Sequence, residues 1–380
     1  MLGYGQSRMC GFSADAALVT TAPPGVFAFS PDDDTPAPWS PRIAEVTSTP
    51  AVRKNIRRLV PAVEVAYKLR KLAFGETGMV AMASIYRDWG LKNAAPVVVS
   101  TAARPGYSYA QLKRRTQPYG WLLMAARGLT EHAETQNLTP RVDFIPFVQG
   151  EGDRLDTAVE YAAKLAELAE HLNEDIKRIT GQTEDIPLLV DQIDTRVDER
   201  ISAVAYAQLE QGLFNDRVVC VGPSSQQRRP DGVHFSAEGY LERALAFAYA
   251  ASYRARTGQK FTPLRVREAK RSGSKVTLFF DGDGVTWPLK LPSQLVFNQL
   301  GIILEPLAGG PPVRIARSSL ILPDRCVLRL ETDPHGPLTI LIGGGYADGC
   351  SITDAGALVH PITENRMWHY ASIQRIVTDR

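Results

Sequence analysis

Three side chains that together could carry out acyl transfer lie far apart in the chain. Ser7 stands near the start, whereas Asp231 and His234 stand together in a later segment. A serine hydroxyl becomes a nucleophile when a histidine accepts its proton, and a carboxylate bound to that histidine fixes its tautomer and stabilises the imidazolium. The spacing of Asp231 and His234 lets one loop carry both groups. The fold must then bring Ser7 to that loop.

The first 257 residues alternate short apolar runs with long helical stretches, a pattern that predicts repeated βα units around a parallel sheet. The expected strands are 1–4, 26–29, 97–100, 144–148, 187–191 and 218–221. The expected helices are 77–88, 120–136, 155–179, 199–213 and 236–256. One buried face of the helix at 155–179 is predicted by apolar residues in steps of three or four, namely Leu155, Val159, Ala162, Leu165, Leu168, Leu172 and Ile176.

The candidate residues all follow expected strands. Ser7 follows the first strand, Gly106 follows the strand at 97–100, and Gln149 comes directly after the strand at 144–148. The loop with Asp231 and His234 follows the strand at 218–221. Ligands of open parallel sheets gather at the carboxyl ends of the strands, so these four segments are expected to meet at one edge.

Beyond Phe261 the pattern changes to short apolar runs separated by Gly, Pro and Asp turns, and no comparably long helix is expected. The predicted strands there are 275–280, 313–316, 320–322, 326–330 and 338–342. This pattern is typical of a small β-sandwich. We therefore expect an α/β domain at 1–258 and a β-rich domain at 262–380.

Bulk properties exclude several classes of protein. A net charge of +2 from 43 basic and 41 acidic residues argues against nucleic acid as a partner. The short basic clusters at 53–58, 113–115 and 228–229 are expected to be solvated. No apolar run reaches the roughly 18 residues that span a bilayer, and no basic-then-apolar leader opens the chain. The sequence also suggests a protein that is extracellular or associated with a virion rather than cytoplasmic.

The four cysteines are far apart and form no metal-binding pattern. We expect buried thiols, with a bridge between Cys326 and Cys350 as the alternative. The histidines likewise show no spacing typical of metal ligands. Neither a metal nor an organic cofactor is therefore expected.

The order of four sequence blocks resembles the SGNH/GDSL hydrolase superfamily, and within it the carbohydrate esterases similar to sialate O-acetylesterase and acetylxylan esterase. The blocks are GQS at 5–7, ARPGYS at 103–108, QGEGD at 149–153 and DGVHFSAEGY at 231–240. The resemblance covers roughly residues 1–255 and implies a flavodoxin-like three-layer α/β fold. It departs from the family pattern at Arg8, where members commonly have asparagine after the serine.

The resemblance implies a role for each matching residue. Ser7 would be the nucleophile, His234 the general base and then the general acid, and Asp231 the partner of the histidine. The oxyanion hole would combine the backbone N–H groups of Ser7 and Gly106 with the side-chain amide of Gln149. Two further residues of the third block are expected to brace that loop, namely Glu151 and Asp153.

The functional hypothesis is a serine esterase that removes O-acetyl groups from an acetylated glycan: sialic acid, xylan or a bacterial surface polysaccharide. The alternative is a carbohydrate-binding or structural module without turnover, for instance in a surface or phage-tail assembly. A third reading keeps the enzyme but changes the substrate to a lipid or a thioester. A homo-oligomer or a larger assembly is compatible with each hypothesis.

Overall fold

The fold is described from a computed structural model of the chain. The model describes residues 1–14, 16–29, 59–69, 72–91, 95–198, 200–225, 227–283, 289–290, 301–343, 352–359 and 366–378. The basic cluster at 53–58 and Cys350 lie outside these residues. Cys10, Cys220 and Cys326 are buried, as expected, and the alternative of a bridge between Cys326 and Cys350 stays untested.

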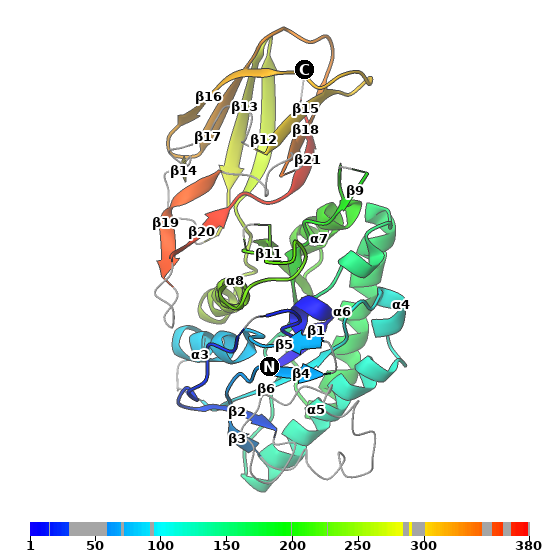
Figure 1. Ribbon diagram of the computed structural model, residues 1–380, viewed down its shortest axis with the longest axis vertical. Helices are drawn as coiled ribbons and strands as arrows, with labels where there is room; N and C mark the ends of the chain where they lie inside the picture. The colour runs from blue at the N-terminus through cyan, green and yellow to red at the C-terminus, as the bar shows by residue number, and fades with distance from the viewer. Residues whose placement is uncertain are drawn as a thin grey trace.

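A sheet of seven strands forms the centre of the first part of the chain (Figure 1). Its order is β11-β8-β7-β1-β6-β2-β3, and its strands are β1 (Leu2–Gly5), β2 (Val26–Phe29), β3 (Leu59–Pro61), β6 (Val97–Ala103), β7 (Ile145–Val148), β8 (Leu188–Gln192) and β11 (Val218–Pro223). Six strands run parallel, as predicted, and β3 adds an antiparallel edge. β1 lies in the middle of the sheet between β6 and β7, and the chain adds β2 and β3 on one side of it and β8 and β11 on the other.

Helices cover both faces of this sheet (Figure 1). One face carries α3 (Met79–Gly90) and α8 (Ala237–Thr257). The other carries α5 (Gln117–Thr135), α6 (Ala158–Thr180) and α7 (Ala203–Phe214), with the short α4 (Tyr109–Leu112) before α5. Neighbouring strand residues point into opposite cores, as β strands require: Leu188 and Val190 pack on the α6 side, and Leu189 packs on the α8 side. The three-layer α/β prediction is confirmed.

The predicted buried face of the helix at 155–179 is wrong at its amino end. Leu155 is 75% exposed and Val159 is 80% exposed. The helix begins only at Ala158, where Thr157 and Glu160 form a capping box, so Leu155 precedes it. The face that packs on the sheet instead runs through Tyr161, Leu165, Leu168, Leu172 and Ile176.

Three antiparallel sheets form the last part of the chain. The first contains β12 (Arg265–Ser272), β13 (Lys275–Asp281), β17 (Arg325–Leu330) and β16 (Ile315–Ile321); the second contains β15 (Ile302–Pro306), β18 (Leu338–Ile342) and β21 (Gln374–Val377); the third contains β14 (Leu289–Lys290), β19 (Thr353–Val359) and β20 (Arg366–Tyr370). The first two share one hydrophobic core. The strands predicted at 313–316 and 320–322 are one strand, β16. The prediction missed β12, β14, β15, β19, β20 and β21. Short hairpins add β4 (Tyr67–Leu69) with β5 (Leu72–Phe74), and β9 (Arg196–Val197) with β10 (Arg200–Ile201).

A buried amide joins the two parts of the chain. Gln192, at the end of β8, accepts a hydrogen bond from Ile373 N–H at 2.9 Å and donates one to Ile373 O at 2.8 Å. The Ile373 side chain packs into the core on the α6 side of the large sheet. The β-rich part therefore packs directly against the α/β part.

Candidate active site

Ser7 lies at the carboxyl edge of the sheet, immediately after its central strand. Gly5 is the last residue of β1 and pairs with Ala103 of β6 and with Val148 of β7. The next backbone N–H, that of Gln6, donates to Val148 O at 2.9 Å. A short 3-10 helix, η1 (Ser7–Met9), then begins, and Ser7 is only 7% exposed. The sheet itself therefore sets the position of the candidate nucleophile.

Asp231 and His234 form the predicted pair within one loop. The His234 Nδ1 atom lies 2.8 Å from Asp231 Oδ2. The other carboxylate oxygen accepts the backbone N–H groups of Val233 at 2.9 Å and of His234 at 2.6 Å. Partial burial opposes ionisation, but the hydrogen bonds from His234 and Val233 outweigh it and lower the Asp231 pKa to about 2. An ionised Asp231 that accepts Nδ1–H leaves Nε2 of His234 free to accept a proton.

The histidine loop rests on the segment that follows Ser7. Arg8 Nε donates to Val233 O at 2.9 Å, directly beside His234. The Phe12 and His234 rings have centroids 4.7 Å apart, and Tyr240 OH donates to Phe12 O at 3.0 Å. No hydrogen bond joins Ser7 Oγ to His234 in the described part of the chain. Such contacts are often longer in unliganded enzymes and tighten when substrate binds.

Arg8 lies at the centre of a buried ionic network. It is 3% exposed, and its Nη1 lies 2.8 Å from Glu151 Oε1 and 3.2 Å from Asp194 Oδ1. Gln6 donates to the other oxygen of Glu151, and Arg229 pairs with Asp194. The expectation that the cluster at 228–229 is solvated is therefore wrong for Arg229. The reason is that Asp194, at the end of a neighbouring strand, supplies its counter-ion.

A second arginine and carboxylate lie deeper in the same region. Burial raises the Asp191 pKa to about 6, although the positive charges of Arg243 and Arg8 oppose the rise. Arg243 is fully buried in α8, and its guanidinium stacks 5.4 Å from the Phe235 ring centroid. Arg8 stacks on the same ring at 4.7 Å. Phe235, the residue after His234, thus contacts both arginines.

Two of the three candidate oxyanion donors have no acceptor. Among the described residues, nothing accepts a hydrogen bond from the backbone N–H of Ser7 or from that of Gly106. The loop with Gly106 is held next to the serine turn because Arg104 N–H donates to Gly5 O at 3.0 Å. Gly106 itself faces open space. These two N–H groups are therefore available to a ligand at this edge.

Both polar atoms of the Gln149 side-chain amide make hydrogen bonds within the protein. Its Nε2 donates to Tyr107 O at 3.3 Å and to Asp153 Oδ2, and its Oε1 accepts from Tyr161 OH at 2.7 Å. Asp153 also accepts Tyr109 N–H at 2.6 Å and pairs with Lys164 at 2.9 Å. The longest of these bonds, to Tyr107 O, is the one that a ligand could replace at lowest cost. The contacts of Asp153 are those of a residue that braces the loop.

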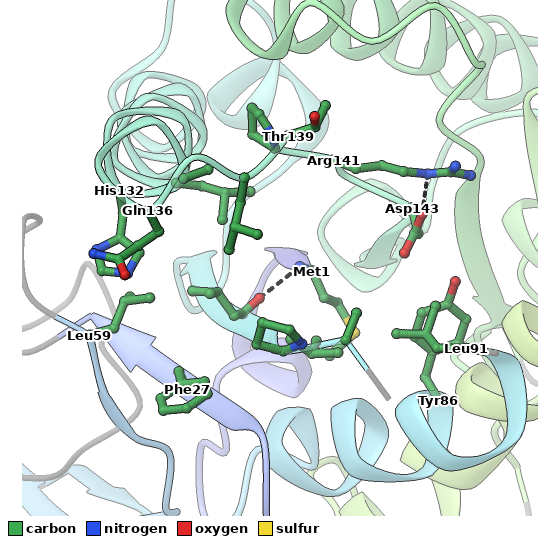
Figure 2. Close-up of a pocket in the computed structure, with 18 of the residues that line it drawn as sticks. Met1, Phe27, Leu59, Tyr86, Leu91, His132, Gln136, Thr139, Arg141 and Asp143 are labelled. Atoms are coloured by element: carbon green, nitrogen blue, oxygen red, sulfur yellow. Dashed lines mark hydrogen bonds and ion pairs between the residues drawn. The ribbon is translucent and has the colours of Figure 1, made fainter. Parts of the chain in front are cut away.

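A separate cavity of about 820 Å³ lies at the opposite edge of the sheet, where the strands begin (Figure 2). Met1, Phe27, Tyr86 and His132 line it, together with an ion pair in which Arg141 Nε lies 2.5 Å from Asp143 Oδ1. Among the described residues, its lining includes none of the predicted site residues and no serine or cysteine. The described residues hold no group of three or more His, Cys, Asp or Glu side chains placed to bind a metal.

Sequence reasoning missed the network around the candidate triad. Arg8 was visible only as a departure from a family pattern, and its position beside Ser7 was the available signal. Asp194 and Arg243 carried no signal, because their partners come from distant segments. Burial of an arginine depends on tertiary contacts, which a local pattern does not encode.

The chain thus has a three-layer α/β fold, with the candidate triad at the carboxyl edge of its sheet. A model of the family described as "Carbohydrate esterase, sialic acid-specific acetylesterase" matches residues 2–253, so the chain belongs to that family and is a carboxylic ester hydrolase. No protein of curated function matches the sequence. In the described part of the chain no helix is long and apolar enough to cross a membrane.

The solved structures that resemble this chain include one carbohydrate acetylesterase. A carbohydrate acetylesterase from Xanthomonas citri is 14% identical with a TM-score of 0.56, over 99% of this chain and 79% of that one. A protein from Arabidopsis thaliana is 18% identical with a TM-score of 0.45, over 66% of this chain and 96% of that one. The protein NanS is 14% identical with a TM-score of 0.47, over 67% of this chain and 97% of that one. At these identities the first likeness shows the fold alone.

Proposed function

We propose that the protein removes O-acetyl groups from a carbohydrate through an acyl-enzyme, with Ser7, His234 and Asp231 as its triad. The observation that carries the proposal is the 2.8 Å contact between His234 Nδ1 and Asp231 Oδ2, in a loop bonded to Arg8, the residue next to Ser7. Membership of the carbohydrate esterase family supports the glycan substrate. Sialic acid, xylan and bacterial surface polysaccharide are the candidate glycans.

The reaction would proceed in two balanced steps. Ser7 Oγ attacks the acetyl carbonyl carbon while His234 Nε2 accepts the hydroxyl proton, and the bond to the sugar oxygen breaks as His234 returns that proton to it. Water then attacks the acyl carbon of the acetyl-serine while His234 Nε2 accepts its proton. The bond to Ser7 Oγ breaks as His234 returns that proton to Ser7, which releases acetic acid that ionises to acetate in solution. The backbone N–H groups of Ser7 and Gly106 stabilise the oxyanion, and the Gln149 amide joins them by giving up its bond to Tyr107 O.

The test compares wild type with Ser7→Ala on p-nitrophenyl acetate and on an O-acetylated glycan. We expect Ser7→Ala to lose at least about a thousandfold in kcat, because no acyl-enzyme can form. A fluorophosphonate probe should label wild type and not the variant. Equal rates for the two proteins would remove Ser7 from the mechanism. Absence of both labelling and turnover in folded wild type would favour a binding module on the same scaffold.

A further inference from the structure

Three cations lie side by side on the outer face of the first antiparallel sheet. Lys275 of β13 is directly opposite Arg329 of β17, and Arg329 is directly opposite Arg317 of β16. Both arginines are exposed and Lys275 is half-buried. The fourth strand completes the line with Ser272, which is exposed and opposite Lys275. We call Lys275, Arg317 and Arg329 the cationic row.

The register of β16 is what brings the third cation into the row. Ile315 pairs with Leu330, Arg317 pairs with Arg329, and Ala316 between them has no partner of its own. An extra residue of this kind is a β-bulge, which re-aims the side chains that follow it. The inward-facing neighbours of the row, Val276 and Leu328, are buried in the shared core. The cations therefore stand on the solvent side of the sheet.

The row carries uncompensated charge. Like charges directly opposite one another on neighbouring strands destabilise a sheet. Elsewhere on this sheet the cations have partners: Lys270 lies 2.9 Å from Glu268, and Arg325 lies 3.6 Å from Asp324. Across the described residues, no carboxylate pairs with any member of the row. In the free protein the three cations thus repel one another, and a bound anion would relieve this repulsion.

The row lies far from the candidate triad. β12 starts at Arg265, beside the segment that contacts the α/β part, because Ser372 N–H donates to Leu264 O next to Ile373. The row stands at the other end of β12 and β13, beyond eight strand residues, about 25 Å away. Figure 1 shows these strands extending away from the α/β part. An anion bound there would not reach Ser7.

We infer that the cationic row is a binding site for an anionic polysaccharide that carries carboxylates on its sugars. This deepens the proposed function, on which it rests, by naming the charge class of the polymer and a site that holds it away from the reacting ester. Guanidinium groups match carboxylates in a bidentate geometry, and a row across neighbouring strands suits an extended polymer with repeated charges. The low net charge of the chain means that the row is not part of a generally basic surface.

The binding experiment uses the full chain with polygalacturonate as the anionic probe and dextran as the neutral one. Wild type should bind polygalacturonate, more weakly as salt rises, and should not bind dextran. The triple variant K275S/R317S/R329S should bind about tenfold more weakly. The matched control Arg127→Ser removes an exposed cation from α5 and should bind as wild type does. A melting temperature of the triple variant at or above that of wild type would confirm that it folds.

The kinetic experiment separates this inference from the proposed function. On acetylated polygalacturonate the triple variant should show about a tenfold higher KM with little change in kcat. Ser7→Ala should bind polygalacturonate as wild type does while losing turnover. Undiminished binding by the triple variant, or binding of dextran or double-stranded DNA as tight as that of polygalacturonate, would overturn the cationic row. Turnover that persists in Ser7→Ala would instead overturn the triad and leave the binding result standing.

Discussion

The two sides of the candidate active site are built in different ways. The serine side grows directly from the centre of the sheet, and Ser7 is buried beside the paired ends of three strands. The histidine side is a surface loop in which the Asp231 side chain is 42% exposed and the His234 side chain 15% exposed. Its contacts are local, apart from the bond to Arg8 and the packing on Phe12.

The position of the nucleophile and the position of the base therefore depend on different kinds of contact. Backbone pairing across the sheet holds the turn at Ser7, and no single side chain can release it. The histidine is oriented by one carboxylate, and its loop is tied to the serine turn by one guanidinium. Substitution of side chains on the histidine side should therefore lower activity. Substitutions that strain the backbone on the serine side should lower stability.

Asp231→Asn should give the largest effect and should leave the fold intact. Asparagine can donate from its amide to Nδ1, which favours the tautomer that has no free acceptor at Nε2, so we expect kcat to fall about 10³–10⁴-fold. Circular dichroism and hydrolysis of p-nitrophenyl acetate would test this. A variant with more than a tenth of wild-type activity would contradict the assigned role.

The pKa of Asp231 extends this prediction to pH. Because its folded pKa of about 2 lies below the unfolded value of about 3.9, Asp231 stabilises the fold above the unfolded pKa. That contribution is lost as pH falls toward 2. Urea unfolding at a series of pH values should accordingly show that wild type loses more stability than Asp231→Asn as the pH falls from about 4 toward about 2. Equal losses of stability in the two proteins over this pH range would contradict the low pKa of Asp231.

Two glycine substitutions, one on each side of the site, should differ in how far they lower the free energy of unfolding. Gly5 has a φ of +141°, and a Cβ there would lie 2.1 Å from Val148 O, so we expect Gly5→Ala to lower the unfolding free energy by at least about 3 kcal/mol. Gly232, in the histidine loop, has a φ of +78° and open space around a Cβ. Gly232→Ala should therefore cost only about 1 kcal/mol. Urea unfolding of both variants would measure the difference, and equal losses would contradict the comparison.

The sequence was sufficient for the parts of the molecule that local patterns encode. Apolar runs located the six parallel strands, and the rule that ligands lie at the carboxyl ends of strands placed Ser7, Gly106 and Gln149 on adjacent strands. The prediction failed at the start of α6 because a second local signal, the capping box of Thr157 and Glu160, overrides the apolar periodicity there. Leu155 continues the apolar periodicity, yet capping at Thr157 leaves it outside the helix.

Tertiary contacts limited the prediction of the charged residues and of the β-rich part. The sequence predicts Arg229 to be a surface charge, but the fold places Asp194 beside it. The strand β12 is predominantly polar, with only Val266 and Ala269 buried, so its apolar signal is weak. Long-range pairing, and not composition, determines both features.

Arg8 is where the two sides of the site meet, and its replacement should give a smaller effect than that of Asp231. We expect Arg8→Gln to lower kcat about 10–100-fold, because loss of the bond to Val233 O frees the histidine loop and leaves Glu151 and Asp194 short of a counter-ion. Arg114→Gln is the matched control, since it breaks a pair with Asp175 remote from the site. A positioning role predicts that added guanidinium ion partly restores kcat in Arg8→Gln while KM changes little. If both arginine variants lose stability equally and kcat is unchanged, Arg8 contributes to folding alone and the histidine loop is positioned without it.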